Sequence, residues 1–250
     1  MKKTFLYIVL ISVLIFMWEV GTKNNSNLRL LISSPSNSFS YFKSNFGFLI
    51  EALKFTALES IVGLVFALLI SFVFMYVCLR IPKLFDFILP VMIVSQVIPV
   101  VTLAPLFIVL FGIGLISKIA MAILMCFFPI FISLASGIKS IDENYKNLFS
   151  IYNAKPNTKI VKLYLPFSLP FLFSGLKVSS TLAVIGSIVA EFSGAEYGLG
   201  KNLFLSSKRL DAELMINSIL LSCLLGGLFY LLIVIFERYF GKWYLKNSIN

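Results

Sequence analysis

The stretch Asp142–Pro156 reads DENYKNLFSIYNAKP and lies between two long apolar stretches, Leu115–Ile138 and Phe167–Ala190. Its apolar residues recur at the spacing of one helix face, which predicts a short amphipathic helix connecting two membrane spans. These residues are Tyr145, Leu148, Phe149 and Tyr152. Asn153 stands where this helix would end, because Asn tolerates the left-handed conformation that follows many helices. An ordinary interfacial helix that lies on the lipid headgroups is the alternative.

The composition is that of a membrane protein. Of the 250 residues, 59% are hydrophobic and 13% are charged, and the mean hydropathy is +0.98, which leaves too little polar surface to cover a soluble globule. A helix crosses a hydrocarbon core of about 30 Å with roughly 20 mainly apolar residues. This template predicts an all-α, polytopic bundle of six transmembrane helices: Thr4–Val20, Phe55–Leu79, Phe87–Phe111, Leu115–Ile138, Phe167–Ala190 and Leu214–Phe240.

The distribution of Lys and Arg predicts that both termini lie in the cytoplasm. The inner segments then hold the larger basic set: Lys2, Lys3, Arg80, Lys83, Lys139, Lys146, Lys155, Lys159, Lys162, Arg238, Lys242 and Lys246. The outer segments hold Lys23, Arg29, Lys43, Lys54, Lys118, Lys201, Lys208 and Arg209. We assign much of the net charge of +10 to this topology and to attraction by the membrane surface rather than to nucleic-acid binding.

The first predicted span also fits a secretory signal peptide, because two lysines precede a short apolar run. Glu19–Thr22 is a poor match to a small-residue cleavage site, so we expect a retained helix with Trp18 as an interfacial anchor. The following segment, Thr22–Ser44, is rich in Asn and Ser, which predicts an external loop or a surface helix.

The third predicted span carries three prolines: Pro90, Pro99 and Pro105. Each proline removes a backbone donor and strains the preceding turn, so we expect a kinked or broken helix. Broken helices at membrane depth occur where they pack in protein or line a water-filled path, which makes Gln96, Pro99 and Pro105 candidates for a pathway wall. A kinked helix that only packs is the alternative. Gly112–Gly114 predicts a tight external turn.

Two acidic residues within predicted spans, Glu59 and Glu191, are functional candidates by default. Near the outer ends of their helices, they would make an external mouth mildly acidic and favour neutral or cationic solutes. Snorkelling to the interface and a structural ion pair are the alternatives. Lys177 starts roughly ten residues into its span, and the sequence leaves its depth open.

The residue types present exclude several chemistries. Histidine is absent, and Cys78, Cys126 and Cys223 lie singly in different spans, so we expect neither a disulfide framework nor a metal site. Gly198–Asn202 is the nearest approach to a phosphate-binding loop, and it lacks the first glycine and the final hydroxyl. We therefore expect no catalytic residue, no enzymatic activity and no bound cofactor.

The segment Tyr145–Pro166 resembles the cytoplasmic EAA motif of permease subunits of ATP-binding-cassette importers. Ala154 and the pair Leu165-Pro166 match that motif in register. The Glu-Ala-Ala of the motif is replaced by Asn147, Leu148 and Phe149, and its glycine is replaced by Asn153.

Two further segments resemble the branch of these permeases that serves nitrate, sulfonates, taurine and thiamine precursors. They are Leu103–Gly114 with Ser117–Ile119, and Val189–Phe192 with Gly198–Gly200. The resemblance covers roughly Phe48 to Trp243. It implies a type I importer permease fold in three parts: an N-terminal helix and loop (1–50), a permease domain (51–240) and, within it, a coupling region (142–166).

The resemblance also implies partners. Two permeases, by default identical, would form the pathway in a bacterial plasma membrane, and an external binding protein would deliver the solute. A separate cytoplasmic ATPase would bind ATP and receive the coupling helix through these residues: Tyr145, Asn147, Leu148, Phe149, Tyr152, Asn153 and Ala154. A gradient-driven transporter and a membrane assembly factor are the alternatives, although internal repeats or a relay of intramembrane acids, typical of the former, are not evident.

Overall fold

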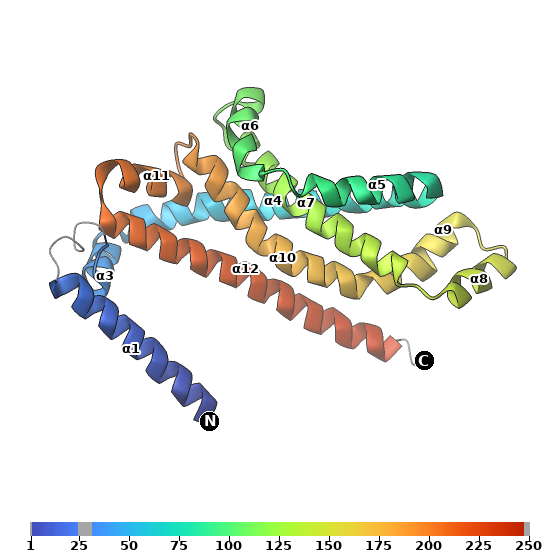
Figure 1. Cartoon of the computed structure of the whole chain (residues 1–250), viewed down its shortest axis with the longest axis horizontal. Helices are drawn as coiled ribbons and strands as arrows, with labels where there is room; N and C mark the ends of the chain where they lie inside the picture. The colour runs from blue at the N-terminus through green and yellow to red at the C-terminus, as the bar shows by residue number, and fades with distance from the viewer. Residues whose placement is uncertain (1, 25–31, 248–250) are drawn as a thin grey trace.

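The computed structural model describes residues 2–24 and 32–247, and these residues form helices joined by short turns (Figure 1). The predicted all-α class is therefore confirmed for the described chain. The helices are α1 (Lys2–Asn24), α3 (Pro35–Ser44), α4 (Phe46–Arg80), α5 (Pro82–Ser95), α6 (Ala104–Phe111), α7 (Leu115–Lys139), α8 (Glu143–Ile151), α9 (Pro156–Lys159), α10 (Leu165–Phe192), α11 (Leu199–Arg209) and α12 (Ala212–Asn247), with a 3₁₀ turn at Val100–Leu103 and a π turn at Ile160–Tyr164.

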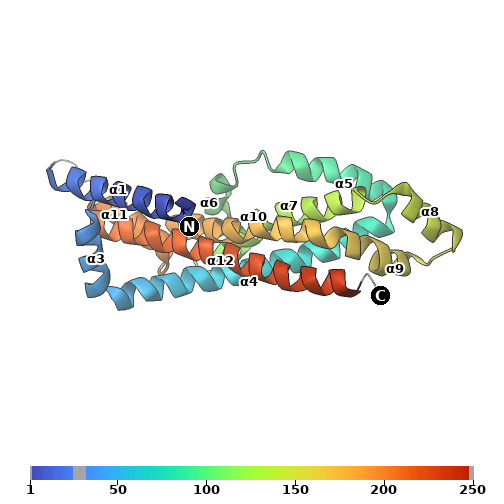
Figure 2. The same ribbon diagram turned by 90° about the horizontal axis from the view of Figure 1, so that it is seen from below.

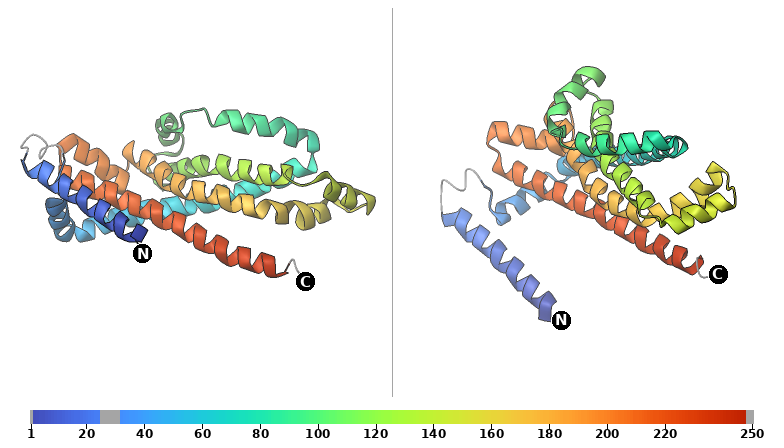
Figure 3. Two further views of the ribbon diagram at one scale, coloured as in Figure 1. Left: turned by 60° about the horizontal axis from the view of Figure 1, so that its bottom comes forward. Right: turned by 45° about the vertical axis from the view of Figure 1, so that its right-hand side comes forward.

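Four helical segments of the described chain are long and apolar enough to cross a membrane: Phe46–Arg80, Leu115–Lys139, Pro156–Phe192 and Ala212–Phe240. The bent pair Lys83–Ser95 and Val100–Phe111 makes a fifth span if it counts as one. The sixth predicted span corresponds to α1, which projects away from the other helices (Figures 1 and 3), so the count of six stays a prediction. The predicted external segment contains α3, while Arg29 lies outside the described residues.

The elongated bundle has two distinct ends (Figure 2). We call them the α8 end, which also holds the C-terminal part of α12, and the α11 end, where α3 crosses the bundle. The most extensive packing joins α7 to α10 and to α4. The core around α7 is made of fully buried apolar side chains, among them Cys126, Ile130, Phe131, Leu134 and Ala135.

Small residues bring these three helices together, as is common between helices in membranes. A Cβ atom built on Gly63 of α4 would lie 2.4 Å from the Cβ of Ala122 in α7. A Cβ atom on Gly186 of α10 would lie 3.0 Å from the Cα of the same Ala122. The backbones of α4, α7 and α10 therefore meet at this level without intervening side chains.

The third predicted span is broken, as its prolines indicate. α5 ends at Ser95, and the helical path resumes after Pro99 at an angle of 88°. Pro90 lies inside α5, whereas Pro105 lies in the first turn of α6, where its missing N–H costs nothing. Gly112 follows α6 with a φ of 80° and forms the expected turn with Gly114, which caps α7.

The helix after Pro156 differs from expectation. The sequence predicts that a membrane helix begins near Pro166, but α9, the π turn and α10 form one continuous segment of 37 residues, Pro156–Phe192. Pro166 lacks an N–H and its ring crowds the carbonyl one turn before it, which favours the wider π turn at Ile160–Tyr164. Pro166 thus lies within a helix rather than at its start.

Candidate functional site

Both ends of α8 are closed by its own sequence. The Asp142 side chain accepts a hydrogen bond of 2.8 Å from the N–H of Asn144 and caps the N-terminus. At the other end Asn153 has a φ of 44°, which confirms the predicted left-handed residue. The N–H groups of Asn153 and Ala154 donate to the carbonyls of Ser150 and Phe149, both at 3.0 Å. This pattern is a complete Schellman motif, so α8 stops sharply.

The predicted apolar stripe of α8 is largely uncovered. Tyr145, Leu148 and Tyr152 are 49%, 46% and 77% exposed, while Phe149 is partly buried. The Tyr145 ring lies 5.3 Å from the ring of Phe167, which fixes one edge of the stripe against α10. An exposed apolar face of this kind is typical of a surface that contacts another protein or a membrane.

The two acidic candidates lie together near the α11 end. Glu59 of α4 and Glu191 of α10 are 2% and 1% exposed, and their carboxyl groups are immediate neighbours. Their burial excludes snorkelling to the interface. Among the described residues neither forms a salt bridge, so the ion-pair alternative is not supported either.

The Glu191 side chain, on α10, accepts hydrogen bonds from two other helices, α4 and α11. Its Oε1 accepts a hydrogen bond of 2.7 Å from Oγ1 of Thr56, and its Oε2 accepts one of 2.6 Å from the N–H of Gly200. Thr56 Oγ1 in turn accepts a bond of 2.9 Å from the N–H of Leu199. The first turn of α11 therefore closes on an internal carboxyl group, which assigns the glycine-rich Gly198–Asn202 segment a structural role.

The Glu191 side chain leaves no room for a Cβ atom at the two glycines of this turn, Gly198 and Gly200. A Cβ atom on Gly198 would lie 2.1 Å from Oε1 of Glu191, and one on Gly200 would lie 2.7 Å from the Cβ of Glu191. Gly198 also has a φ of 116°, which side-chain-bearing residues rarely adopt. Glu191 and the two glycines therefore form one packing unit, although six residues separate Glu191 from Gly198 and eight separate it from Gly200.

The side chains of the broken span lie apart from the two acidic residues. Gln96 caps α5, and the side chains of Gln96, Pro99 and Pro105 are exposed. Val97 and Val109 on the same segment are 82% and 83% exposed. The structure brings Glu59 and Glu191 together but does not bring these three pathway candidates to them. The uncovered apolar side chains of α5 and α6 instead form a separate face.

Lys177 pairs with an acidic residue of the neighbouring helix α12. Its Nζ lies 2.5 Å from Oε2 of Glu237, which joins α10 to α12. Charged residues inside spans commonly pair in this way.

Comparison with known proteins decides the family. Residues 79–246 match the family described as "Binding-protein-dependent transport system inner membrane component". The chain belongs to this family. It is a multi-pass membrane permease of a transport system.

Individual relatives agree with this permease family. The chain is 27% identical to a probable ABC transporter permease of Haemophilus influenzae over 86% of its length and 87% of the relative. It is 35% identical to the formylaminopyrimidine transport permease of Halalkalibacterium halodurans over 63% of each chain. It is 34% identical to a riboflavin permease of Chloroflexus aurantiacus over 62% of its length and 58% of that relative. The expected importer permease is confirmed, and the two alternatives are not favoured.

Sequence reasoning missed several residues of the permease. Ile151 is 77% exposed and widens the apolar face of α8, although it lies off the predicted stripe. Thr56 and Lys118 lie near Glu59 and Glu191. No sequence pattern singled out Thr56, and Lys118 was counted with the external segments. In the structure Lys118 is 7% exposed and belongs to α7. A basic residue one turn inside an apolar helix was the available clue.

Proposed function

We propose that this permease is a type I importer subunit that forms the solute pathway with a second copy of itself and is driven by a separate ATPase. The family description supports this, because a binding-protein-dependent system delivers its solute from an external protein. ATP would be bound and hydrolysed by the partner, since the chain lacks the residues of a phosphate-binding loop. The permease itself then carries no cofactor and no catalytic residue.

The orientation follows from the same proposal. We place the α8 end in the cytoplasm and the α11 end outside, with six spans and both termini inside, in agreement with the positive-inside distribution of Lys and Arg. The permease domain then corresponds to 51–240 and the coupling region to 142–166. The substrate class is a small organic solute or anion of the kind served by this branch, such as a thiamine precursor, a sulfonate, taurine or nitrate.

One observation carries the proposal: the exposed apolar face of α8. Tyr145, Leu148 and Tyr152 project from a helix whose two ends are capped within its own chain, so the face is preorganised for a partner. Burying one such side chain contributes about 1.5–3 kcal/mol, so a few of them suffice for stable docking.

Co-purification with the candidate ATPase tests this function. We expect the wild-type permease to retain the ATPase, and the variant Leu148→Glu/Phe149→Glu to lose it, because two carboxylates in an apolar interface must be desolvated. The matched control is Lys146→Gln/Ser150→Glu, which makes the same change of two charge units on another face of α8 and should retain the ATPase. Retention by the Leu148→Glu/Phe149→Glu variant refutes the docking face, and failure of the wild type to bind any ATPase refutes the importer function.

A further inference from the structure

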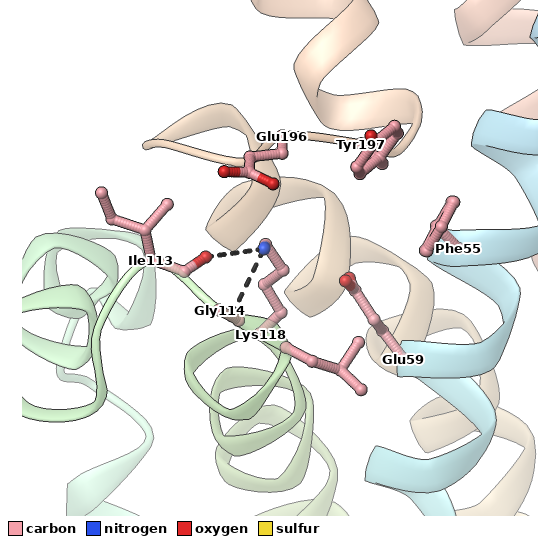
Figure 4. A pocket seen from close by; sticks show the side chains of 8 residues that line it. Phe55, Glu59, Ile113, Gly114, Lys118, Glu196 and Tyr197 are labelled. Carbon is pink, nitrogen blue, oxygen red and sulfur yellow. Dashed lines mark hydrogen bonds between the residues drawn. The ribbon is translucent and has the colours of Figure 1, made fainter.

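A cavity at the α8 end of the bundle differs in chemistry from the one around Lys118. The cavity at the α11 end, of about 220 Å³, is lined by the charged side chains of Lys118 and Glu196 (Figure 4). The cavity at the α8 end has about 330 Å³ and lies between α4, α7 and the π turn that leads into α10. Its wall is apolar except for Tyr76, Tyr164 and Ser168. Apolar cavities exclude water, so this one suits a hydrocarbon group rather than a polar solute.

The cavity opens at the surface of the membrane-spanning helices. Val73 and Tyr76 line it and are 65% and 43% exposed, so it is not sealed. Its walls belong to three segments that are long and apolar enough to cross a membrane: Phe46–Arg80, Leu115–Lys139 and Pro156–Phe192. In a multi-pass membrane permease the surroundings of such an opening are lipid acyl chains.

The position of the cavity along α4 places one end of it near the membrane–water boundary. The α4 residues that line it run from Phe72 to Leu79, which is about 10 Å at 1.5 Å per residue. Arg80 follows directly and is the last residue of α4. Tyrosine and arginine are both typical of this boundary, where an apolar body meets lipid and a polar tip meets the headgroups. An acyl chain in the cavity would therefore have its phosphate near Arg80.

The guanidinium group of Arg80 is held in place and keeps free donors. Its Nε and Nη2 donate to the hydroxyl of Tyr76 at 3.2 and 2.7 Å, and Nη2 also donates to Oδ1 of Asn157. Among the described residues no hydrogen bond or salt bridge occupies Nη1. Two N–H groups thus remain, and a fixed guanidinium group without a carboxylate partner suits a phosphate.

The charges around this end of the cavity favour an anionic headgroup. The three connections next to it, 80–86, 139–146 and 155–162, carry more basic than acidic residues. The basic residues are Arg80, Lys83, Lys139, Lys146, Lys155, Lys159 and Lys162, and the acidic ones are Asp86, Asp142 and Glu143. Lys146 and Glu143 neutralise each other in a salt bridge of 2.8 Å, and the remaining excess is still basic. Basic pockets between membrane helices bind the headgroups of anionic lipids.

We propose that this cavity binds one acyl chain of an anionic membrane phospholipid, whose phosphate accepts hydrogen bonds from Nη1 of Arg80. The chain fills the space between α4 and the π turn, and so keeps the segment that follows α8 apart from α4. The proposed orientation assigns the lipid to the cytoplasmic leaflet, whereas the binding itself requires only a membrane.

Native mass spectrometry of the purified permease–ATPase complex, stripped of lipid and then titrated, tests the site. The probes are phosphatidylglycerol and phosphatidylethanolamine with the same two acyl chains, which differ in the net charge of the headgroup. We expect phosphatidylglycerol to bind at least fivefold more tightly. Equal binding of the two lipids overturns the proposal, and so does an assembled complex that binds neither, as it would if a second copy of the chain covered the opening.

Two variants assign the bound lipid to this cavity. Arg80→Gln removes the phosphate contact and should weaken binding of phosphatidylglycerol at least fivefold, and Val73→Trp narrows the opening and should weaken binding of both lipids. The matched controls are Lys83→Gln, which removes a charge from the same connection, and Val65→Trp, which changes an exposed valine of α4 outside the cavity. Both controls should leave binding unchanged.

The outcomes of these variants decide the site. Binding that neither Arg80→Gln nor Val73→Trp weakens, or that the controls weaken equally, overturns it. If Arg80→Gln does not assemble with the ATPase, Val73→Trp decides alone.

Assembly and lipid binding separate this inference from the proposed function. Stimulation of ATP hydrolysis by the binding protein is measured beside lipid binding. A complex that is stimulated but does not discriminate the two lipids refutes the lipid site and leaves the importer function standing. A wild-type permease that retains no ATPase refutes the function, and titration of the permease alone then still decides the lipid site.

Discussion

Oγ1 of Thr56 donates a hydrogen bond of 2.7 Å to Oε1 of Glu191, and both side chains are almost completely buried. The same hydroxyl accepts the N–H of Leu199 at 2.9 Å. A single oxygen atom therefore joins α4, α10 and α11. A buried donor or acceptor that loses its partner destabilises the fold, so this junction holds the three helices together at the α11 end of the bundle.

The variant Thr56→Val tests that junction. It keeps the shape of the side chain and leaves Oε1 of Glu191 and the N–H of Leu199 each without this partner. Each orphaned group costs about 1–3 kcal/mol, so we expect a clearly lower melting temperature and faster hydrogen exchange at Leu199 and Gly200. The control is Thr181→Val, whose hydroxyl bonds only within α10. Equal stability of the two variants would contradict the junction.

The contact of Gly63 with Ala122 predicts a strong effect of one methyl group. Gly63→Ala would place its Cβ 2.4 Å from that of Ala122, so α4 and α7 must separate. Overpacking of this kind costs about 1–3 kcal/mol. Gly47→Ala in the same helix meets nothing within 4 Å and should stabilise by up to about 1 kcal/mol through helix propensity. Thermal unfolding of the two purified variants should therefore shift in opposite directions, and a shift in the same direction would refute the packing argument.

The left-handed residue at the end of α8 gives a third prediction. Asn153→Gly should keep or slightly improve the cap, whereas Asn153→Val should cost about 1–2 kcal/mol because a β-branched residue does not tolerate the observed φ of 44°. Hydrogen exchange of the amides from Leu148 to Ala154 reports the difference. Similar protection of these amides in both variants would show that the conformation of residue 153 does not determine the stability of α8.

The Lys177–Glu237 pair predicts non-additive effects. Lys177→Met leaves an unpaired carboxylate and Glu237→Gln leaves an unpaired ammonium, so each alone should lower the melting temperature. The double variant should recover part of the loss, with a coupling energy between about 0.5 and 3 kcal/mol. Strictly additive losses in this cycle would mean that the two charges do not interact.

Local features were predictable from the sequence, and the reasons are physical. The helical periodicity and Asn153 predicted α8 and its end, because both act through the nearest neighbours in the chain. The three prolines predicted the broken span for the same reason. Composition predicted the apolar helices, and in the described chain four of them, or five with the bent pair, are long and apolar enough to cross a membrane.

Features that depend on contacts between distant segments were not predictable. Glu59 and Glu191 were each recognised as suspects, but their adjacency results from the packing of α4 on α10 across Gly63, Ala122 and Gly186. Lys118 was counted with the outer segments although the predicted span Leu115–Ile138 contains it, and its place near Glu59 depends on the packing of α7 against α4. The π turn before Pro166 likewise arises from the strain of one proline within a helix that tertiary packing keeps continuous.

The uninterrupted segment Pro156–Phe192 has a mechanical consequence. At 1.5 Å per residue its 37 residues span about 55 Å, from the loop after α8 to the carboxyl group of Glu191. The loop after α8 lies at one tip of this segment, and the buried junction of Glu191 with Thr56 lies at the other. A displacement of one tip must reach the other unless the π turn yields, and by reciprocity a change at the Glu191 junction alters the affinity of α8 for any partner that binds it.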